Sequence, residues 1–264
     1  MYGKKKIDDG RCIDWGKTSA DYVAYRPGPP ESYYARLVAL GVGLEGQRIL
    51  DLATGTGFLA RNFARQGAQV SAIDISAEQI EAARGQADEE GLRIDFHVAP
   101  AERTPFADAS FDAITANQAW LYFDKAEVIP EVVRLLAKEG QLVVSHFSWL
   151  PRLDPIARRS EALVLKHNPK WSAADWDGEI PPLPEWSMER FRLRAFFRYD
   201  AGIQFTRETW RGRLRACRGV GASLSPEEVA RFDAEHAKLL ERTADETFSV
   251  LYRVQAHLFD PRVS

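Results

Sequence analysis

The chain has 264 residues, of which 45% are hydrophobic and 28% are charged, so one generous α/β domain with a sizeable core is expected. The formal net charge of −3 and the lack of a long polybasic tract argue against general nucleic-acid binding. No apolar run approaches ~18 residues, no signal-peptide pattern is seen, and Cys12 and Cys217 are too few for a disulfide framework. A cytoplasmic protein without a membrane partner is expected, as a monomer or homodimer.

Residues 1–30 are expected to be irregular. The prolines of Tyr25-Arg26-Pro27-Gly28-Pro29-Pro30 oppose a continuous helix and favour an extended, turning segment. Tyr22, Tyr25 and Arg26 are recognition side chains, although aromatic residues here could also serve only to pack the segment onto the core. A helix is expected from Glu31 to Gly41, where glycine is a stop signal.

The most informative stretch runs from Arg48 to Arg61. Ile49, Leu50 and Leu52 form the compact apolar run of a buried parallel strand. Gly55 and Gly57 follow, allow positive φ, and leave no side chain between the backbone and a ligand. The helix that opens at Phe58, and runs to about Gln66, directs free N–H groups into this turn. The sequence therefore predicts a nucleotide-type ligand site, and the lack of a following Gly-Lys-Ser/Thr excludes a Walker A loop.

The run from Gly55 to Ala60 also satisfies G-x-G-x-x-G/A, a weak dinucleotide signal. The next predicted strand, Gln69 to Ile75, contains Asp74 about 20 residues after the glycines, where a ribose-binding carboxylate is expected. Asp74 would accept hydrogen bonds from both ribose hydroxyls. Dinucleotide enzymes use a carboxylate in the same way, so Asp74 indicates a ribose but does not show which ribose-containing cofactor binds. The alternative is that it caps the next helix, a role that Ser76 and Gln79 can fill.

The next predicted elements alternate as in a doubly wound sheet: helix Ala77–Glu90, strand Arg93–Val98, strand Ala113–Ala116, helix Lys125–Lys138, a turn at Lys138-Glu139-Gly140, and strand Gln141–Phe147. Asn117 and Trp120 follow one strand, and His146 and Trp149 lie at the end of another, where ligands bind in open α/β folds. His146 is the candidate general base, with a structural role as the alternative. Trp120 either stacks on a substrate or packs under the following helix.

The composition changes after Leu150, where prolines and the tryptophans at 171, 176 and 186 become frequent and only Pro155 to His167 is expected to be helical. The remaining predicted elements are strand Arg194–Phe205, helices Thr209–Arg218 and Glu227–Asp245, and strand Thr247–Leu258. Arg211, Arg215 and Arg218 share one helix face. That face is either solvated or a subsite for an anionic substrate, because guanidinium binds carboxylate or phosphate in a bidentate manner.

The phrase Leu50-Asp51-Leu52-Ala53-Thr54-Gly55-Thr56-Gly57 resembles the first motif of class I S-adenosylmethionine-dependent methyltransferases. The likeness is to the small-molecule branch, which includes the ubiquinone/menaquinone C-methyltransferases and the trans-aconitate methyltransferases. Tyr25-Arg26-Pro27 resembles the lid segment of that branch. Ala101-Glu102 and Pro105-Phe106 resemble its adenine-binding loop, from which Pro100 departs because the family often has aspartate there. The resemblance covers Tyr25 to about Ser148.

The resemblance implies a Rossmann-like, doubly wound seven-stranded α/β sheet with a final antiparallel hairpin and an insertion between strands five and six. The corresponding organisation is an N-terminal lid (1–30), a cofactor-binding core (31–150), a substrate-side insertion (151–194) and the rest of the same domain (195–264). S-adenosylmethionine would be the cofactor, S-adenosylhomocysteine the product, and the acceptor a small molecule, with the arginines suggesting an acidic one.

The residues that the resemblance and their positions assign to the cofactor are Tyr25, Arg26, Asp51, Ala53, Thr54, Gly55, Gly57, Asp74, Ile75, Ala101, Glu102 and Asn117. The substrate would contact Tyr22, Trp120 and Trp149, with His146 as the catalytic candidate. The five histidines are scattered and no metal site is expected. Two alternatives stay open: an NAD-dependent oxidoreductase, favoured by the glycine pattern, and a non-catalytic S-adenosylmethionine-binding protein, suggested by Pro100 and the lack of an obvious base.

Overall fold

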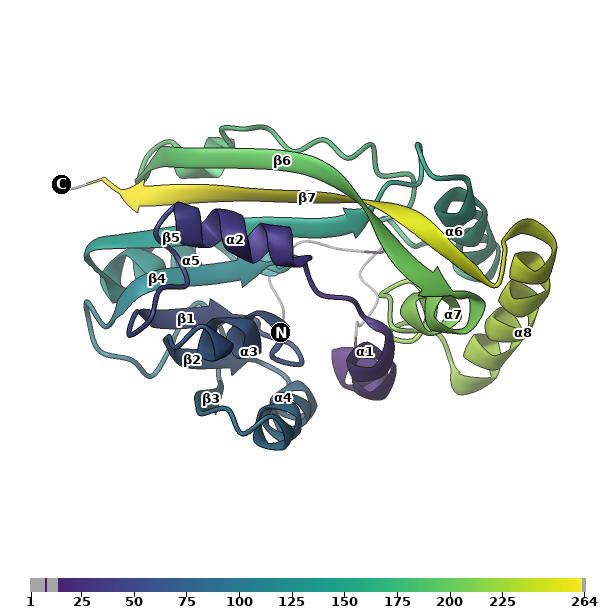
Figure 1. The fold of residues 1–264 in the computed structure, drawn as a ribbon, viewed down its shortest axis with the longest axis horizontal. Coiled ribbons are helices and arrows are strands. Elements are labelled where there is room, and N and C mark those ends of the chain that lie inside the picture. Colours follow the sequence, from purple (N-terminus) through teal and green to yellow (C-terminus); the bar gives the residue numbers. More distant parts are fainter. Residues whose placement is uncertain (1–7, 9–13, 263–264) are drawn as a thin grey trace.

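The structure is a computed structural model that describes Asp8 and residues 14–262. Seven strands form one sheet in the order β3-β2-β1-β4-β5-β7-β6 (Figure 1). The strands are β1 Arg48–Leu52, β2 Gln69–Asp74, β3 Ile94–Val98, β4 Phe111–Asn117, β5 Leu136–Trp149, β6 Phe191–Thr206 and β7 Thr247–Pro261. The strands β1 to β5 pair in parallel, and β7 is antiparallel to both β5 and β6. The predicted Rossmann-like sheet with a final antiparallel hairpin is confirmed.

The helices connect these strands. They are α1 Ser19–Tyr25, α2 Glu31–Ala39, α3 Phe58–Arg65, α4 Ala77–Glu89, α5 Lys125–Leu135, α6 Pro155–His167, α7 Arg207–Arg215 and α8 Pro226–Thr243, with short 3₁₀ turns η2 Trp15–Thr18, η3 Trp120–Tyr122 and η4 Glu185–Ser187. In the part of the chain that the structure describes, no helix is both long enough and apolar enough to cross a membrane.

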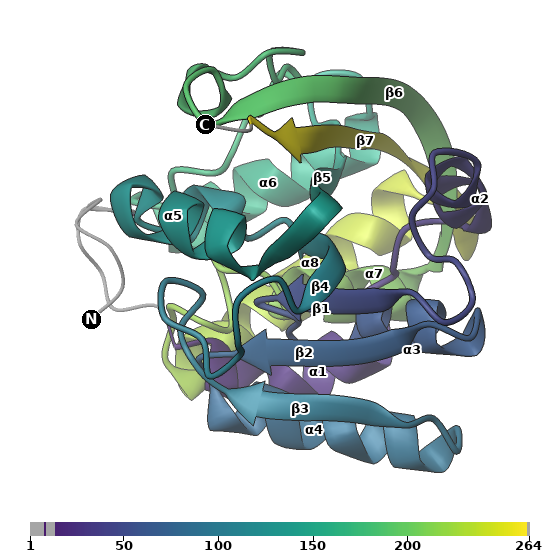
Figure 2. The same ribbon diagram turned by 90° about the vertical axis from the view of Figure 1, so that its left-hand side faces the viewer.

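Helices cover both faces of the sheet because successive side chains of a strand point to opposite faces. On β1, Ile49 belongs to the hydrophobic cluster that includes Leu37 of α2 and Phe63 of α3. Its neighbour Leu50 belongs to a second cluster with Val132 of α5. Figure 2 shows α3 and α5 on opposite sides of the central strands. The carboxyl ends of the parallel strands are therefore left open between the two helical layers.

Three helices gather beyond the carboxyl end of β5: α6 from the insertion, and α7 and α8 from the connection between β6 and β7 (Figure 1). The helix α6 begins as predicted because Asp154 Oδ1 accepts from the backbone N–H groups of Ile156 and Ala157, both at 2.9 Å. Asp154 Oδ2 accepts from the Leu251 N–H at 2.9 Å and so ties the helix to β7. This assembly forms one wall beside the open strand ends.

The N-terminal part differs from the expectation of an irregular segment. Residues Ser19 to Tyr25 form α1. Because the first proline of this segment is Pro27, the prolines end the helix and do not prevent it. The helix α1 is attached to α7 by the ion pair between Asp21 and Arg215 at 3.0 Å, so the segment has a fixed place against the C-terminal half of the chain.

A second difference concerns the expected turn before β5. The helix α5 ends at Leu135 and the strand starts directly at Leu136, which pairs with Phe111 across a register shift. Gly140 lies in the strand and not in a turn. A methyl group there would lie 3.0 Å from the carbonyl oxygen of Phe111, so this glycine serves the close approach of β4 and β5 at the irregularity.

A polar chain is buried among α6, α7 and α8. The Trp210 Nε1–H donates to Ser160 Oγ at 2.9 Å, and Ser160 Oγ lies 2.9 Å from His236 Nε2. His236 is fully buried, and this burial lowers its pKa to about 4. The imidazole is therefore neutral at physiological pH and acts as a hydrogen-bonding core residue.

Protonation of His236 is expected to make the fold acid-sensitive. The unfolded chain titrates this histidine near about 6.5, so between the two pKa values the unfolded state binds more protons and acid favours unfolding. Its contribution to the free energy of unfolding should fall by about 2 kcal/mol between about pH 7.5 and about pH 5. Urea unfolding of wild type and His236→Gln at both pH values measures this. Equal pH slopes for the two proteins would contradict the assignment.

Candidate functional site

The turn after β1 uses a backbone conformation that side chains rarely adopt. Ala53, Gly55 and Gly57 have φ values of 50°, 57° and 76°. Gln118, directly after the neighbouring strand β4, has φ 60°. A residue other than glycine in this left-handed region costs roughly 1–2 kcal/mol. Ala53 and Gln118 follow adjacent strands, so the backbone is strained at this edge of the sheet. Such strain is typical of ligand-binding sites.

The two predicted glycines serve different purposes. A methyl group at Gly57 would lie 3.1 Å from the Ala83 Cβ, so this glycine lets α4 pack closely against the turn. At Gly55 the nearest atom would be Tyr22 Cε1 at 3.7 Å. The missing side chain of Gly57 is explained by helix packing, whereas Gly55 has no such packing reason, and the close approach of a ligand to its backbone stays a prediction.

Asp51 is buried under this turn with only 2% of its surface exposed. The hydroxyl groups of Thr54 and Thr115 donate to its two carboxylate oxygens, each at 2.6 Å. Burial raises the pKa of Asp51 to about 6, against the opposing effect of these two hydrogen bonds. No cationic side chain pairs with Asp51 among residues 14–262. The carboxylate is thus an unbalanced negative charge that favours a cationic ligand group.

Asp74 lies at the end of β2, beside the same turn. Its Oδ2 accepts from the Gly55 N–H at 2.9 Å, and its Oδ1 accepts from the Ser76 N–H at 3.0 Å. Each oxygen keeps a further lone pair for a ligand hydroxyl. Ser76 Oγ caps α4 by accepting from the Gln79 N–H at 3.3 Å. The cap that was the alternative role for Asp74 is therefore supplied by Ser76.

Apolar surface is exposed at the ends of β2 and β3. Ile75 is 41% exposed and Val98 is 56% exposed, and the adjacent Asp74 is the strand partner of Val98. Ala101 is buried, and Glu102 Oε1 accepts from the Asp124 N–H at 3.0 Å, where α5 begins. Of the residues predicted to hold an adenine, Ile75 offers open surface, whereas the Glu102 carboxylate is already bound within the chain. Val98 is an addition that the sequence did not single out.

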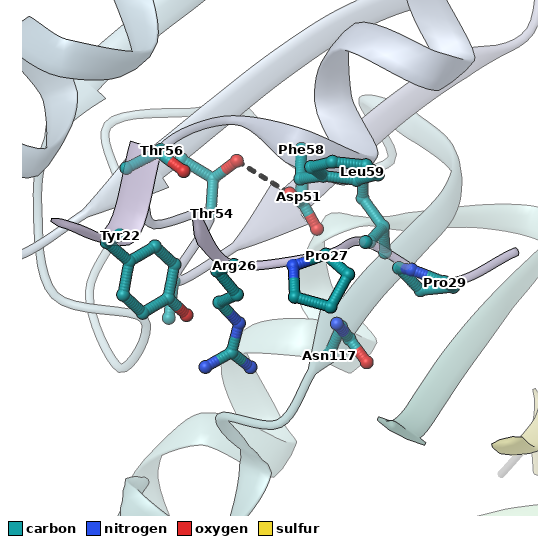
Figure 3. Close-up of a pocket in the computed structure, with 12 residues that line it drawn as sticks. Tyr22, Arg26, Pro27, Pro29, Asp51, Thr54, Thr56, Phe58, Leu59 and Asn117 are labelled. Carbon is teal, nitrogen blue, oxygen red and sulfur yellow. Dashed lines mark hydrogen bonds between the residues drawn. The ribbon is translucent and has the colours of Figure 1, made fainter. Parts of the chain in front are cut away.

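A cavity lies between the turn after β1 and the N-terminal segment (Figure 3). Its walls are Tyr22, Arg26, Pro27, Gly28 and Pro29 from that segment, Asp51, Ala53, Thr54 and Thr56 from β1 and its turn, Phe58 and Leu59 from α3, and Asn117 from β4. The cavity joins predicted cofactor residues from both parts of the chain. It also includes Tyr22, which was predicted on the substrate side.

The N-terminal segment closes this cavity tightly. The volume is about 40 Å³, room for only a few water molecules, whereas small-ligand sites have about 300–1,000 Å³. A methyl group at Gly28 would lie 1.5 Å from the Phe58 ring. The 26–29 segment therefore has to move before a nucleotide-sized ligand can occupy the strand ends.

Asn117 is held in place from behind. Its Oδ1 accepts from Ser145 Oγ at 3.1 Å, and Ser145 Oγ accepts from the Tyr33 hydroxyl at 2.9 Å. In Figure 3 the amide nitrogen of Asn117 points toward Pro27 and the oxygen points away. This chain of hydrogen bonds leaves the amide N–H group as the one that faces the cavity.

The three predicted residues of the N-terminal segment have different surroundings. Tyr22 lies against Gly55, and the Arg26 guanidinium lies 4.6 Å from the centre of the Tyr22 ring. Burial lowers the pKa of Arg26. Tyr25 packs on α7 instead, where a methyl group at Gly212 would meet its ring at 2.2 Å. Tyr22 and Arg26 therefore line the cavity, and Tyr25 attaches the segment to α7.

His146 lies near the carboxyl end of β5. Its ring centre is 4.6 Å from that of Trp176 in the insertion. Burial, together with the positive charge of Arg26, lowers the pKa of His146 to about 4. The imidazole is neutral at physiological pH and so is able to accept a proton, although its low pKa makes it a weak base.

The two tryptophans predicted on the substrate side are both buried. Trp120 packs against Trp186, with ring centres 4.7 Å apart. Trp149 Nε1 donates to Glu161 Oε1 at 2.6 Å, and the Arg213 guanidinium lies 4.6 Å from the centre of the Trp149 ring. Trp120 thus contacts the insertion, and Trp149 supports a buried arginine.

The arginines near α7 divide into two groups. The three predicted to share a face are already ion-paired within the chain, through Arg211–Asp233, Arg215–Asp21, Arg215–Asp233 and Arg218–Asp8. Arg213, on another face of α7, was not singled out from the sequence. The available signal was its spacing, since a residue two positions from both Arg211 and Arg215 must point away from them.

Comparison with known proteins identifies the family. A methyltransferase domain family model matches residues 50–144, which contain Asp51, Asp74 and Asn117. The demethylmenaquinone methyltransferase of Thermus thermophilus is 38% identical over 120 residues, 44% of this chain and 54% of that protein. The chain therefore spans only about half the length of that relative.

A longer match is to the ubiquinone biosynthesis O-methyltransferase of Xanthomonas axonopodis pv. citri, which is 32% identical over 202 residues, 71% of this chain and 80% of that protein. Among solved structures, a protein of Anaeromyxobacter dehalogenans assigned as a type II methyltransferase has a TM-score of 0.59 at 20% identity, covering 89% of this chain and 97% of that one. The structural likeness concerns the fold. The sequence match to the Xanthomonas protein, which covers four fifths of that protein, shows that the chain belongs to the class I S-adenosylmethionine-dependent methyltransferases.

Proposed function

We propose that this protein transfers a methyl group from S-adenosylmethionine to a small-molecule acceptor. The observation that carries the proposal is the pair of carboxylates at adjacent strand ends, Asp51 and Asp74, on either side of the Gly55 turn. Membership of the methyltransferase family supports this reaction and gives no support to the NAD-dependent oxidoreductase.

The site residues suit the chemical groups of this cofactor. Asp74 has lone pairs for the two ribose hydroxyls, and Ile75 with Val98 offers apolar surface for adenine. The unbalanced charge of Asp51 suits the cationic methionine end, while the guanidinium of Arg26 suits its carboxylate. Thr54 and the amide of Asn117 line the same cavity, and the Gly55 turn lies beside Tyr22. When bound, S-adenosylmethionine supplies a methyl group that is attached to a sulfonium. The leaving group is S-adenosylhomocysteine, in which this sulfur is a neutral thioether.

The chain itself has to align the acceptor and exclude water. The segment from Tyr22 to Pro29 closes over the strand ends in this structure and would do so again over the bound cofactor. His146 is the candidate base if the acceptor loses a proton, since its imidazole is neutral and it lies near the carboxyl end of β5.

The insertion, residues 151–194, would form the acceptor side. Trp176 packs on His146 and Trp186 packs on Trp120, so the insertion contacts two of the residues proposed for this side. Trp149 also contacts the insertion, through its hydrogen bond to Glu161 of α6, whereas Tyr22 lines the cavity beside the Gly55 turn. The relatives' names refer to demethylmenaquinone and to ubiquinone biosynthesis, so hydroxylated aromatic and quinol rings head the list of acceptors to test.

Calorimetric titration tests cofactor binding first. Wild-type protein should bind S-adenosylhomocysteine with micromolar affinity and should show no heat with NAD under the same conditions. Heat with NAD alone would contradict the proposal.

Turnover is then measured with S-adenosylmethionine carrying an isotopically labelled methyl group and a panel of catechols, quinols and aromatic acids. Label should pass to at least one acceptor. Tight binding of S-adenosylhomocysteine, with no transfer to any acceptor across the panel, would instead support the non-catalytic binding protein.

A further inference from the structure

Four arginines are buried among the described residues, and one of them lacks a counter-ion. Arg61 is paired with Glu90, Arg218 with Asp8 and Arg253 with Asp200. Arg213 is only 3% exposed and forms no ion pair in residues 14–262 or with Asp8. Its Nε and Nη1 atoms donate to no acceptor there. An unpaired guanidinium withdrawn from water is costly to the fold, which calls for a compensating ligand.

The groups around Arg213 do not neutralise it. Its guanidinium lies over the Trp149 ring and near Tyr252. Burial raises the pKa of Tyr252, and the positive charge of Arg213 acts to lower it. Neither of the buried carboxylates of this region is within ion-pair distance of Arg213: Glu161 accepts from Trp149 Nε1, and Asp154 accepts from backbone N–H groups at the start of α6 and on β7. The face of the Trp149 ring thus holds the cation in place without supplying a full negative charge.

Arg213 also lies next to the proposed methyl-transfer site. Its neighbour in sequence, Gly212, packs against Tyr25 at the base of the N-terminal segment. The positive charge of Arg213 contributes to the lowered pKa of Arg26, whose side chain lines the cavity. Arg26 in turn lowers the pKa of His146. Arg213 is therefore near Arg26, on the helix against which Tyr25 packs, and does not itself line the closed cavity.

We infer that Arg213 is a specificity-determining residue that binds a carboxylate of the methyl acceptor. This inference rests on the proposed function, because the anion is assigned to the acceptor and not to the cofactor. A planar guanidinium binds a carboxylate through two parallel N–H···O bonds. The flanking Trp149 and Tyr252 favour an acceptor whose carboxylate is attached to an aromatic ring.

The test uses Arg213→Met, which keeps the apolar length of the side chain and removes the charge, and Arg213→Lys, which keeps the charge. Arg211→Met is the matched control, since Arg211 lies on the same helix and is ion-paired to Asp233. Each protein is titrated with S-adenosylhomocysteine. The loaded protein is then titrated with benzoate, with benzyl alcohol as the neutral analogue and inorganic phosphate as the other anion.

Benzoate should bind wild type at least tenfold more tightly than benzyl alcohol or phosphate, and Arg213→Met should lose at least tenfold in benzoate affinity. Arg213→Lys should keep part of the affinity, and Arg211→Met should match wild type. S-adenosylhomocysteine affinity should change less than twofold in Arg213→Met. The melting temperature of unliganded Arg213→Met should rise, because the substitution removes the cost of burying an unpaired charge. A lower melting temperature would show that Arg213 is a structural residue.

The two proposals fail in different ways. No S-adenosylhomocysteine binding by wild type would contradict the proposed function, whatever the anions do. Normal S-adenosylhomocysteine binding without any benzoate binding would contradict only the carboxylate subsite. Phosphate binding in place of benzoate would overturn the assignment of a carboxylate. An equal loss of cofactor and benzoate affinity in Arg213→Met would assign Arg213 to the cofactor.

Discussion

Replacing Asp74 by alanine is expected to weaken S-adenosylhomocysteine binding by about 100- to 1,000-fold. A hydrogen bond to a charged group contributes about 1.5–3 kcal/mol, and two ribose hydroxyls would lose such a partner. The variant also removes the acceptor of the Gly55 and Ser76 N–H groups, which loosens the turn that the cofactor contacts. Calorimetry measures the affinity, and circular dichroism at the same temperature establishes that the variant is folded.

The matched control for this prediction is Asp95→Ala. Asp95 is an exposed aspartate on the neighbouring strand β3 and pairs with His97, so its removal changes the net charge equally without touching the turn. Asp74→Asn should lose about tenfold, because the amide keeps one acceptor for the backbone but has no charge. Binding by Asp74→Ala within threefold of wild type would rule out the ribose role.

Local signals account for the parts of the fold that were predictable. The helix α6 spans Pro155 to His167 as expected, because proline is favoured in a first turn and the preceding Asp154 caps it. The apolar strand, the alternating glycines and Asp74 are also close in sequence, so the family could be inferred from the sequence and is confirmed. The assignment of single site residues, and the boundaries of the lid and insertion, stay predictions.

The features that were missed depend on contacts between distant residues. Thr115 donates to Asp51 because β1 and β4 are adjacent in a register that places these two residues side by side. Among the described residues, Arg213 has no ion pair because the acidic residues that α1 and α8 bring to α7, Asp21 and Asp233, pair with Arg215 on another face of the helix. Spacing along the chain places Arg213 on a different face from Arg211 and Arg215, but it reveals neither the missing ion pair of Arg213 nor the bond between Thr115 and Asp51. The helix α1 was missed for a different reason, because too much weight was given to prolines that follow it.

Asp51→Asn is expected to weaken S-adenosylhomocysteine binding by about 10- to 100-fold while raising the melting temperature of the free protein. The pKa of Asp51 is about 6 in the fold and about 3.9 in an unfolded chain. Between these values the folded state binds more protons, so stability from this group falls as pH rises. Above about pH 6 the buried charge costs at most roughly 3 kcal/mol, which the amide avoids.

The same titration predicts how binding depends on pH. Wild-type affinity for S-adenosylhomocysteine, whose ammonium group would face Asp51, should fall as pH drops from about 8 to about 5 because the carboxylate is neutralised in that range. The affinity of Asp51→Asn should change little over that range, and the gap between the two proteins should narrow in acid. A variant that melts well below wild type, or that keeps the wild-type pH dependence, would show that Asp51 supports the fold and not the cofactor.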